Sequence, residues 1–122
     1  MSESQRTAPR VLLLCGDLFF STQLRSAAQA QGVSVDVELQ APRAVERAAS
    51  GGYRLIVVDL EFANLDLPAL LSELPVENRP HVLAFGPHVQ AQRLKAARDA
   101  GCDHVVPRSI AVEAIAKLVG GG

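Results

Sequence analysis

The run Leu55-Ile56-Val57-Val58-Asp59 decides how this chain is interpreted. Four consecutive apolar residues, with no polar residue between them, are typical of a strand that is covered on both faces of a sheet. The run ends in a single carboxylate, and open α/β sheets keep their chemistry at the carboxyl ends of their strands. Asp59 is therefore the candidate functional residue, and the ends of the other strands show which partners it has.

Four more segments have the character of strands. Segments 11–15 and 82–85 are apolar throughout, so we expect them in the centre of the sheet. Segment 33–38, Val-Ser-Val-Asp-Val-Glu, alternates strictly and predicts an edge strand with one face in water. Segment 104–106 is short and is followed by Pro107, which makes it the other edge candidate.

Helical patterns separate these strands, at about 18–31, 42–50, 67–74, 89–100 and 109–119. Asp17 or Ser21 is available as N-cap of the first helix, and Ser109 as N-cap of the last. The stripe expected to face the sheet in the last helix consists of Ile110, Ala114, Ile115 and Leu118. Strict alternation of strands and helices with short links predicts one doubly wound (βα)5 domain with a parallel five-stranded sheet.

Composition limits the classes of function. The 122 residues fit one domain, which we place at 10–119, with a flexible segment at 1–9 and a glycine tail at 120–122. A net charge of −1 offers no basic patch for nucleic acid or for a membrane surface. The apolar runs are far shorter than the roughly 20 residues of a membrane span, and the polar start lacks a signal peptide, so we expect a cytoplasmic protein.

Cysteines and histidines give no sign of a cross-link or a metal site. Cys15 and Cys102 are expected at opposite ends of strands about 16 Å long, whereas a disulfide needs Cα atoms within roughly 7 Å. Two reduced thiols are therefore expected. His81, His88 and His104 follow no spacing that is typical of zinc ligands, so we expect no bound metal.

From about Arg10 to Val119 the chain resembles the receiver domain of bacterial two-component response regulators. The resemblance rests on the order and lengths of the elements, on Asp59, and on Gly101-Cys102-Asp103, which is similar to the Gly-Ala-Asp turn before the last receiver strand. It implies a flavodoxin-like, CheY-like sheet with strand order 2-1-3-4-5. It also implies that Asp59 corresponds to the residue that accepts the phosphoryl group.

The other positions that receivers use are altered. Two adjacent acids normally end the first strand and hold Mg²⁺, but here they correspond to Cys15 and Gly16, which are not hard oxygen ligands. The hydroxyl residue that ends the fourth strand corresponds to Gly86, and the aromatic switch residue of the fifth strand corresponds to Val105. The chain thus resembles a degenerate receiver, called a pseudo-receiver.

The position of the receiver lysine depends on the alignment. Without a gap it corresponds to Arg108, whereas aligning the prolines places Val106 there. An arginine at this position is expected to pair with Asp59 and to neutralise it permanently, which would give Asp59 a structural role.

Two residues of the altered pocket allow two interpretations each. Asp17 either rebuilds a cation site with Asp59 and the backbone carbonyl of Glu61, or simply caps the helix that follows it. Cys15 is either a reactive thiolate near a helix N-terminus or a buried, inert thiol. The degenerate acidic pocket as a whole consists of Cys15, Gly16, Asp17 and Glu61.

Apolar side chains and one surface complete the expectations. We expect Phe19, Phe62 and Pro87 to cover the former phosphorylation pocket. In receivers the surface that corresponds to helix 89–100, strand 104–106 and the helix after it binds partner proteins, so we expect a signalling partner there. A homodimer is also open.

The resulting hypothesis is a pseudo-receiver that acts in signal transduction through phosphorylation-independent protein–protein interaction, with no enzymatic activity and no cofactor. The alternative is a phosphoacceptor that a histidine kinase phosphorylates at Asp59, with non-standard residues at the Mg²⁺ site and with Asp17 and Arg108 as the unusual partners of Asp59. A third reading, a small-ligand binder at the carboxyl edge of the sheet, has only the general tendency of the fold behind it.

Overall fold

The computed structural model of the chain describes residues 10–120 and contains one parallel sheet of five strands. The strands are β1 (Arg10–Leu14), β2 (Ser34–Glu38), β3 (Leu55–Asp59), β4 (His81–Gly86) and β5 (His104–Pro107). Their order in the sheet is β2-β1-β3-β4-β5, which confirms the predicted fold and both predicted edges. Asp59 lies beside Phe85, and Gly86 lies beside Pro107, so the ends of β3, β4 and β5 meet at one edge.

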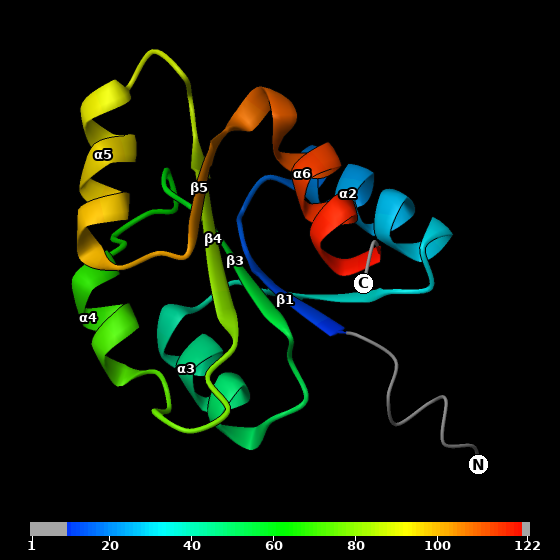
Figure 1. Cartoon of the computed structure of the whole chain (residues 1–122), viewed down its shortest axis with the longest axis horizontal. Helices are drawn as coiled ribbons and strands as arrows, with labels where there is room; N and C mark the ends of the chain where they lie inside the picture. Colours follow the sequence, from blue (N-terminus) through cyan, green and yellow to red (C-terminus); the bar gives the residue numbers. More distant parts are fainter. Residues whose placement is uncertain (1–9, 121–122) are drawn as a thin grey trace.

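Five helices cover the two faces of the sheet: α2 (Leu18–Ala30), α3 (Ala41–Ser50), α4 (Leu67–Glu73), α5 (Ala91–Ala100) and α6 (Arg108–Gly120). Helices α2 and α6 lie on one side of the sheet and α3, α4 and α5 on the other (Figure 1). Within residues 10–120, no helix combines the length and the apolar character that crossing a membrane requires.

Two hydrophobic cores result from this arrangement, one on each face. Successive residues of a strand point to opposite faces, so Ile56 and Val58 enter the core under α3, α4 and α5, while Val57 enters the core under α2 and α6. All five residues of β3 are buried, as expected for a central strand between two helical layers.

The ends of the chain fall partly outside the described residues. Segment 1–9, Gly121 and Gly122 lie outside them, and Gly120, which we placed in a tail, is the last residue of α6. The predicted N-cap Ser109 was wrong, because α6 begins at Arg108, directly after β5. At the first helix Asp17 is the N-cap, while Ser21 lies inside α2.

The buried face of α6 also differs from the prediction. Its buried residues are Ala111, Ile115 and Val119, whereas Ile110 and Leu118 are 47% and 39% exposed. The helix packs against α2 as well as against β4 and β5, which turns a different stripe inward than packing on the sheet alone would. Two large apolar side chains of α6 therefore face solvent.

The edge strand β2 departs from simple alternation at Glu38. We predicted this residue on the wet face, but it is only 6% exposed. Its carboxylate accepts hydrogen bonds from the backbone N–H groups of Leu39 and Gln40 at 3.0 and 3.1 Å, and from Arg47 Nη1 at 3.1 Å. Gln40 is the N-cap of α3 but makes no side-chain capping bond, so Glu38 supplies the negative charge at this helix start.

A second carboxylate extends this network along the edge strand. Asp36 Oδ2 accepts a 2.6 Å hydrogen bond from the Tyr53 hydroxyl and a 2.9 Å bond from Arg10 Nη2, and Arg47 Nη2 lies 3.5 Å from it. The Arg10 guanidinium also lies 4.4 Å from the centre of the Tyr53 ring. These contacts tie β2 to the start of β1 and to the turn before β3.

Glu38 should make the stability of the protein depend on acidic pH. Burial alone would raise the pKa of Glu38, but the hydrogen bonds from Arg47, Gln40 and Leu39 outweigh burial and lower it below its ordinary 4.5. A lowered pKa in the folded state adds stability that is present above pH 4.5 and is lost as the pH falls through the folded pKa.

We therefore expect Glu38→Gln to lower the free energy of unfolding at pH 7 by about 1.5–3 kcal/mol, because charged hydrogen bonds are lost. The difference from the wild type should shrink as the pH falls below 4.5 and through the folded-state pKa of Glu38, because the wild type then protonates this carboxylate. Urea unfolding at several pH values measures this, with the exposed Glu46→Gln as control. A difference that stays constant with pH would contradict the role assigned to Glu38.

Candidate functional site

The carboxylate of Asp59 lies at the end of β3 and is almost fully buried, with 4% of the residue exposed. Its Oδ1 accepts a 2.9 Å hydrogen bond from the backbone N–H of Glu61. Its Oδ2 accepts a 3.3 Å bond from the Cys15 thiol and lies 3.7 Å from Nη1 of Arg108. Both oxygens of Asp59 are therefore engaged by groups of this chain.

Arg108, the first residue of α6, is the centre of a cluster of acids. Its Nη2 donates to Oδ2 of Asp17, and its Nη1 lies 3.9 Å from Oε1 of Glu61 in addition to its contact with Asp59. Val106, the other alternative for the lysine position, instead packs against the core under α2 and α6. Arg108 is thus the residue that the structure brings to Asp59.

Two aromatic rings support the guanidinium of Arg108. Phe20 of α2 and Phe85 of β4 are stacked, with ring centroids 4.3 Å apart. The Arg108 guanidinium carbon lies 5.2 Å from the first centroid and 5.4 Å from the second, within the range of a cation–π contact.

The two oxygens of the Asp17 carboxylate have different partners. Its Oδ1 accepts hydrogen bonds from the backbone N–H groups of Phe19 and Phe20 at 2.9 and 3.2 Å, which caps α2. Its Oδ2 is paired with Arg108. The capping interpretation therefore describes one oxygen, and an arginine faces the other.

Cys15 is a buried donor rather than a thiolate. Burial, with the negative charge of Asp59 adding to it, raises the pKa of the Cys15 thiol from its ordinary 9.0 to about 11. The thiol is therefore protonated at neutral pH and can donate to Asp59. Of the two interpretations of Cys15, this direction of shift favours the inert thiol, because a reactive cysteine needs a lowered pKa.

The residues at this edge do not fit the Mg²⁺ ion of receivers. Cys15 offers a protonated sulfur, and Gly16 offers no side chain, although a Cβ at Gly16 would meet nothing within 4 Å. In the part of the chain from 10 to 120, no three His, Cys, Asp or Glu side chains are grouped to hold a metal ion. The guanidinium of Arg108 already faces the carboxylates, and it would repel a divalent cation beside it.

The two switch-equivalent positions are apolar. Gly86 ends β4, and a Cβ there would lie 3.4 Å from Cδ1 of Leu60, whose side chain fills the neighbouring space. Val105 of β5 packs against the core under α3, α4 and α5. Neither position supplies a hydroxyl or an aromatic ring that could respond to a change at Asp59.

A pocket of about 550 Å³ opens over the Asp59 carboxylate. It is lined by Gly16, Asp17, Leu39, Asp59, Glu61, Phe62, Ala63 and Arg108. Of the three apolar residues expected to cover it, Phe62 lines the pocket, whereas Phe19 and Pro87 are not among its lining residues. Phe19 is 73% exposed, because Phe20 takes the inward position at the start of α2. The expectation of a three-residue cover was therefore wrong for two of its members.

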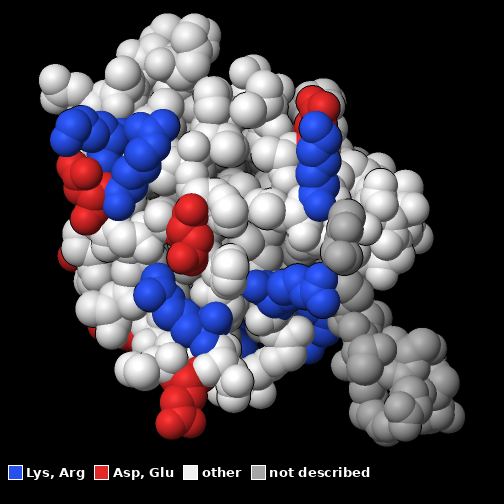
Figure 2. Space-filling model, in the orientation of Figure 1, with Lys and Arg blue, Asp and Glu red and all other residues white. Residues whose placement is uncertain are grey.

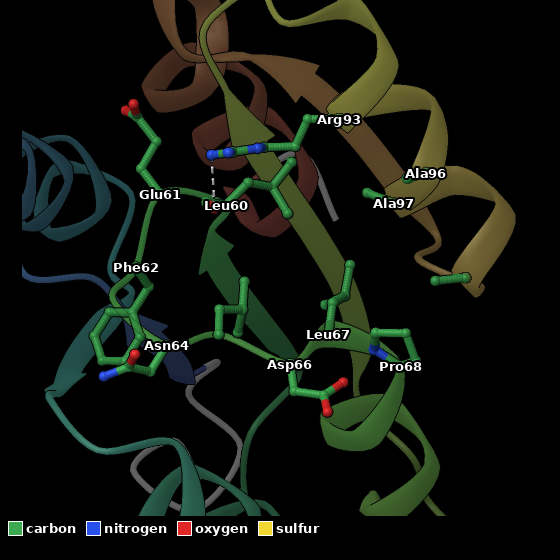
Figure 3. Close-up of a pocket in the computed structure, with 12 residues that line it drawn as sticks. Leu60, Glu61, Phe62, Asn64, Asp66, Leu67, Pro68, Arg93, Ala96 and Ala97 are labelled. Carbon is green, nitrogen blue, oxygen red and sulfur yellow. Dashed lines mark hydrogen bonds between the residues drawn. The ribbon is translucent and has the colours of Figure 1, made fainter.

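Sequence reasoning missed a neighbouring pocket of about 630 Å³ between the segment after β3 and helix α5. In Figure 3, Arg93 extends from α5 across this pocket toward Leu60, whose backbone carbonyl accepts a 3.3 Å hydrogen bond from Nη1 of Arg93. Asp66 lies at the opposite end of the view, beside Leu67 and Pro68. No residue pattern marks this hollow, because its lining mixes apolar, charged and small side chains from the segment after β3 and from α5.

Solved structures with a similar fold include receiver domains. A receiver domain (CheY-like) from Methylobacillus flagellatus has a TM-score of 0.76 and 16% identity, over 94% of this chain and 98% of that one. A receiver domain of a Pseudomonas aeruginosa sensor histidine kinase, with a magnesium ion in its active site cleft, has a TM-score of 0.73 and 17% identity, over 95% and 100%.

A third similar structure is the receiver domain of a Saccharomyces cerevisiae response regulator, crystallised with a histidine phosphotransfer protein. Its TM-score is 0.74 and its identity 17%, over 92% of this chain and 86% of that one. No protein-family model and no curated protein matches the sequence. The chain therefore has the receiver-domain fold.

The raised pKa of Cys15 predicts slow reaction with alkylating agents. In a Cys102→Ala variant at pH 8, iodoacetamide should modify Cys15 of the folded protein at least about 100-fold more slowly than that of the urea-unfolded chain, since each pKa unit is tenfold in thiolate. The protonated thiol also adds stability below pH 9 that is lost as the pH rises toward 11. Intact mass against time measures the rates, and equal rates in both states would contradict this assignment.

Proposed function

We propose that this chain is a pseudo-receiver that acts in signal transduction by binding a partner protein, without phosphorylation at Asp59. The observation that carries the proposal is the engagement of both Asp59 oxygens by Cys15, Glu61 and Arg108. The receiver fold supports the pathway, since it is the fold of two-component signalling proteins. The proposal includes no enzymatic activity and no cofactor.

The chemistry of phosphoryl transfer explains why Asp59 is a poor acceptor. This reaction depends on positioning and on neutralising the charge of the transferred group, which is mostly the work of metal ions and fixed cations. At this edge Cys15 and Gly16 replace the metal-holding acids, and Arg108 is already paired with carboxylates. A phosphorylated Asp59 would also have no hydroxyl at Gly86 to report its presence.

The surface that we propose for the partner is formed by α5, β5 and α6. Figure 2 shows charged side chains gathered at α5 and at α6, with an uncharged surface between them where Figure 1 places β5. Ile110 and Leu118 are exposed on α6, and a pocket of about 320 Å³ lies between α6 and the strands β4 and β5. Exposed apolar side chains beside an edge strand favour a protein partner.

The class of partner protein that we propose is based on the similar receiver domains. The yeast receiver domain described above was crystallised with a histidine phosphotransfer protein, and we propose a signalling protein of the same kind of pathway for this chain. A second copy of the chain is the alternative occupant of the same surface.

A direct test is incubation with acetyl phosphate or beryllofluoride in the presence of Mg²⁺, followed by intact mass and by NMR. We expect no covalent addition and no change in the amide resonances of α5, under conditions that fully modify a standard receiver domain. Asp59→Asn is the matched control. Addition to the wild type that is absent from Asp59→Asn would establish the alternative, a phosphoacceptor with unusual partners.

The partner surface can be tested separately by capture from extracts of the source cell. We expect the wild type and Asp59→Asn to retain the same partner, with or without a phosphodonor, and Ile110→Asp to lose it at least tenfold. An acid in the first turn of α6 favours the helix, so the fold should persist. The control is Val76→Asp, since Val76 is 93% exposed between α4 and β4. Loss of the partner with Asp59→Asn alone would contradict the proposal.

A further inference from the structure

Arg108 lies at a place that is unfavourable for a cation. It is the first residue of α6, and the free N–H groups at a helix start carry partial positive charge. Its side chain is nevertheless held close to the protein, with 29% exposed, rather than extended into solvent. Contacts with other elements must therefore offset both the helix dipole and the loss of side-chain freedom.

Those contacts come from three carboxylates on three separate parts of the fold. Asp17 is the N-cap of α2, Asp59 ends β3, and Glu61 follows it in the segment before α4. Arg108 donates to Asp17 and lies 3.7 and 3.9 Å from the carboxylates of Asp59 and Glu61. One cation thus serves three anions, of which Asp59 is buried and would be costly to leave without a counter-charge.

The shape of the guanidinium is suited to this task. Its planar fork presents nitrogens in different directions, so Nη2 addresses Asp17 while Nη1 addresses Asp59 and Glu61. The same group lies against the stacked rings of Phe20 and Phe85. An ammonium group would be a point charge without this geometry.

We propose that Arg108 is a built-in cation that neutralises the three acids at this edge in place of a metal ion and latches α6 to α2 and β3. The latch holds the junction between β5 and α6 in one arrangement, without a metal ion. This inference goes beyond the proposed function, because it concerns how the edge is neutralised and stands whether or not a partner binds.

The test is a double-mutant cycle between Arg108 and Asp17, read out by urea unfolding at pH 7 and fixed ionic strength. Arg108→Met removes the charge but keeps an unbranched side chain against Phe20 and Phe85. Asp17→Asn removes the negative charge but remains a good N-cap. Each single variant should lower the urea midpoint by roughly 0.3–1 M.

The signature of the latch is that the effect of Asp17→Asn on the urea midpoint changes sign when Arg108 is replaced by Met. In the Arg108→Met background, three acids remain without their cation, so Asp17→Asn should raise the midpoint instead of lowering it. The amides of Val106 and Ile110 should shift in Arg108→Met, because the start of α6 is no longer held. The urea midpoint of the wild type should be the same in 10 mM Mg²⁺ as in EDTA.

The matched control is Arg93→Met, which removes an arginine that donates to a backbone carbonyl at the same edge and contacts none of the three acids in the contacts described. In that background Asp17→Asn should still lower the midpoint. If Arg108→Met does not fold, Arg108→Lys takes its place in the cycle, because lysine keeps the charge and loses the planar fork. Asp17→Asn should then still lower the midpoint, but by less than in the wild type.

Two results would overturn the latch. One is an Arg108→Met variant as stable as the wild type, which would leave only a packing role for Arg108. The other is an Asp17→Asn effect of the same sign and size in both backgrounds. Because the cycle uses neither phosphodonor nor partner, its failure would leave the proposed function standing, and a positive phosphorylation result would not by itself produce the reversal.

Discussion

The buried charge of Asp59 is the constraint on which the rest of the functional edge depends. A carboxylate removed from water at the end of a fully buried strand is stable only when its charge and its lone pairs are met by protein groups. Here a protonated thiol, a backbone N–H and an arginine meet them. Cys15 and Arg108 meet that need directly, and Asp17 and Glu61 share the same arginine.

The two edge strands of the sheet differ in the side-chain contacts that hold them. Edge strand β2 is held by the network of Asp36, Glu38, Tyr53 and two arginines, which favours a rigid, well-specified edge. Edge strand β5 is short, with every residue half-buried, beside exposed apolar residues of α6. An unpaired strand edge is a place where another chain can pair. The second edge is the one that we propose for a partner.

Much of the fold followed from local patterns, because continuous apolar runs and strict alternation report directly how many faces of a strand are covered. Two failures share one cause. Glu38 was placed in water and Ile110 was turned inward, since each depends on what packs against it from another element. The failure at Ser109 is local, because α6 begins one residue earlier, at Arg108. Arg47 reaches Glu38 from the next helix, and α2 sets the rotation of α6.

What the amino-acid sequence determined by itself is which chemical groups stand at the strand ends: one acid at 59, a thiol and a glycine at 15 and 16, and no hydroxyl at 86. These identities can be read directly from the sequence, and they leave Asp17 as the alternative cation ligand beside Asp59. Only the tertiary structure decided that Arg108, rather than Val106, meets Asp59, and that Asp17 and Glu61 share the same cation. Residues 17, 59 and 108 are far apart in the chain, and their side chains meet because parallel strands end at one edge while α6 leans on α2.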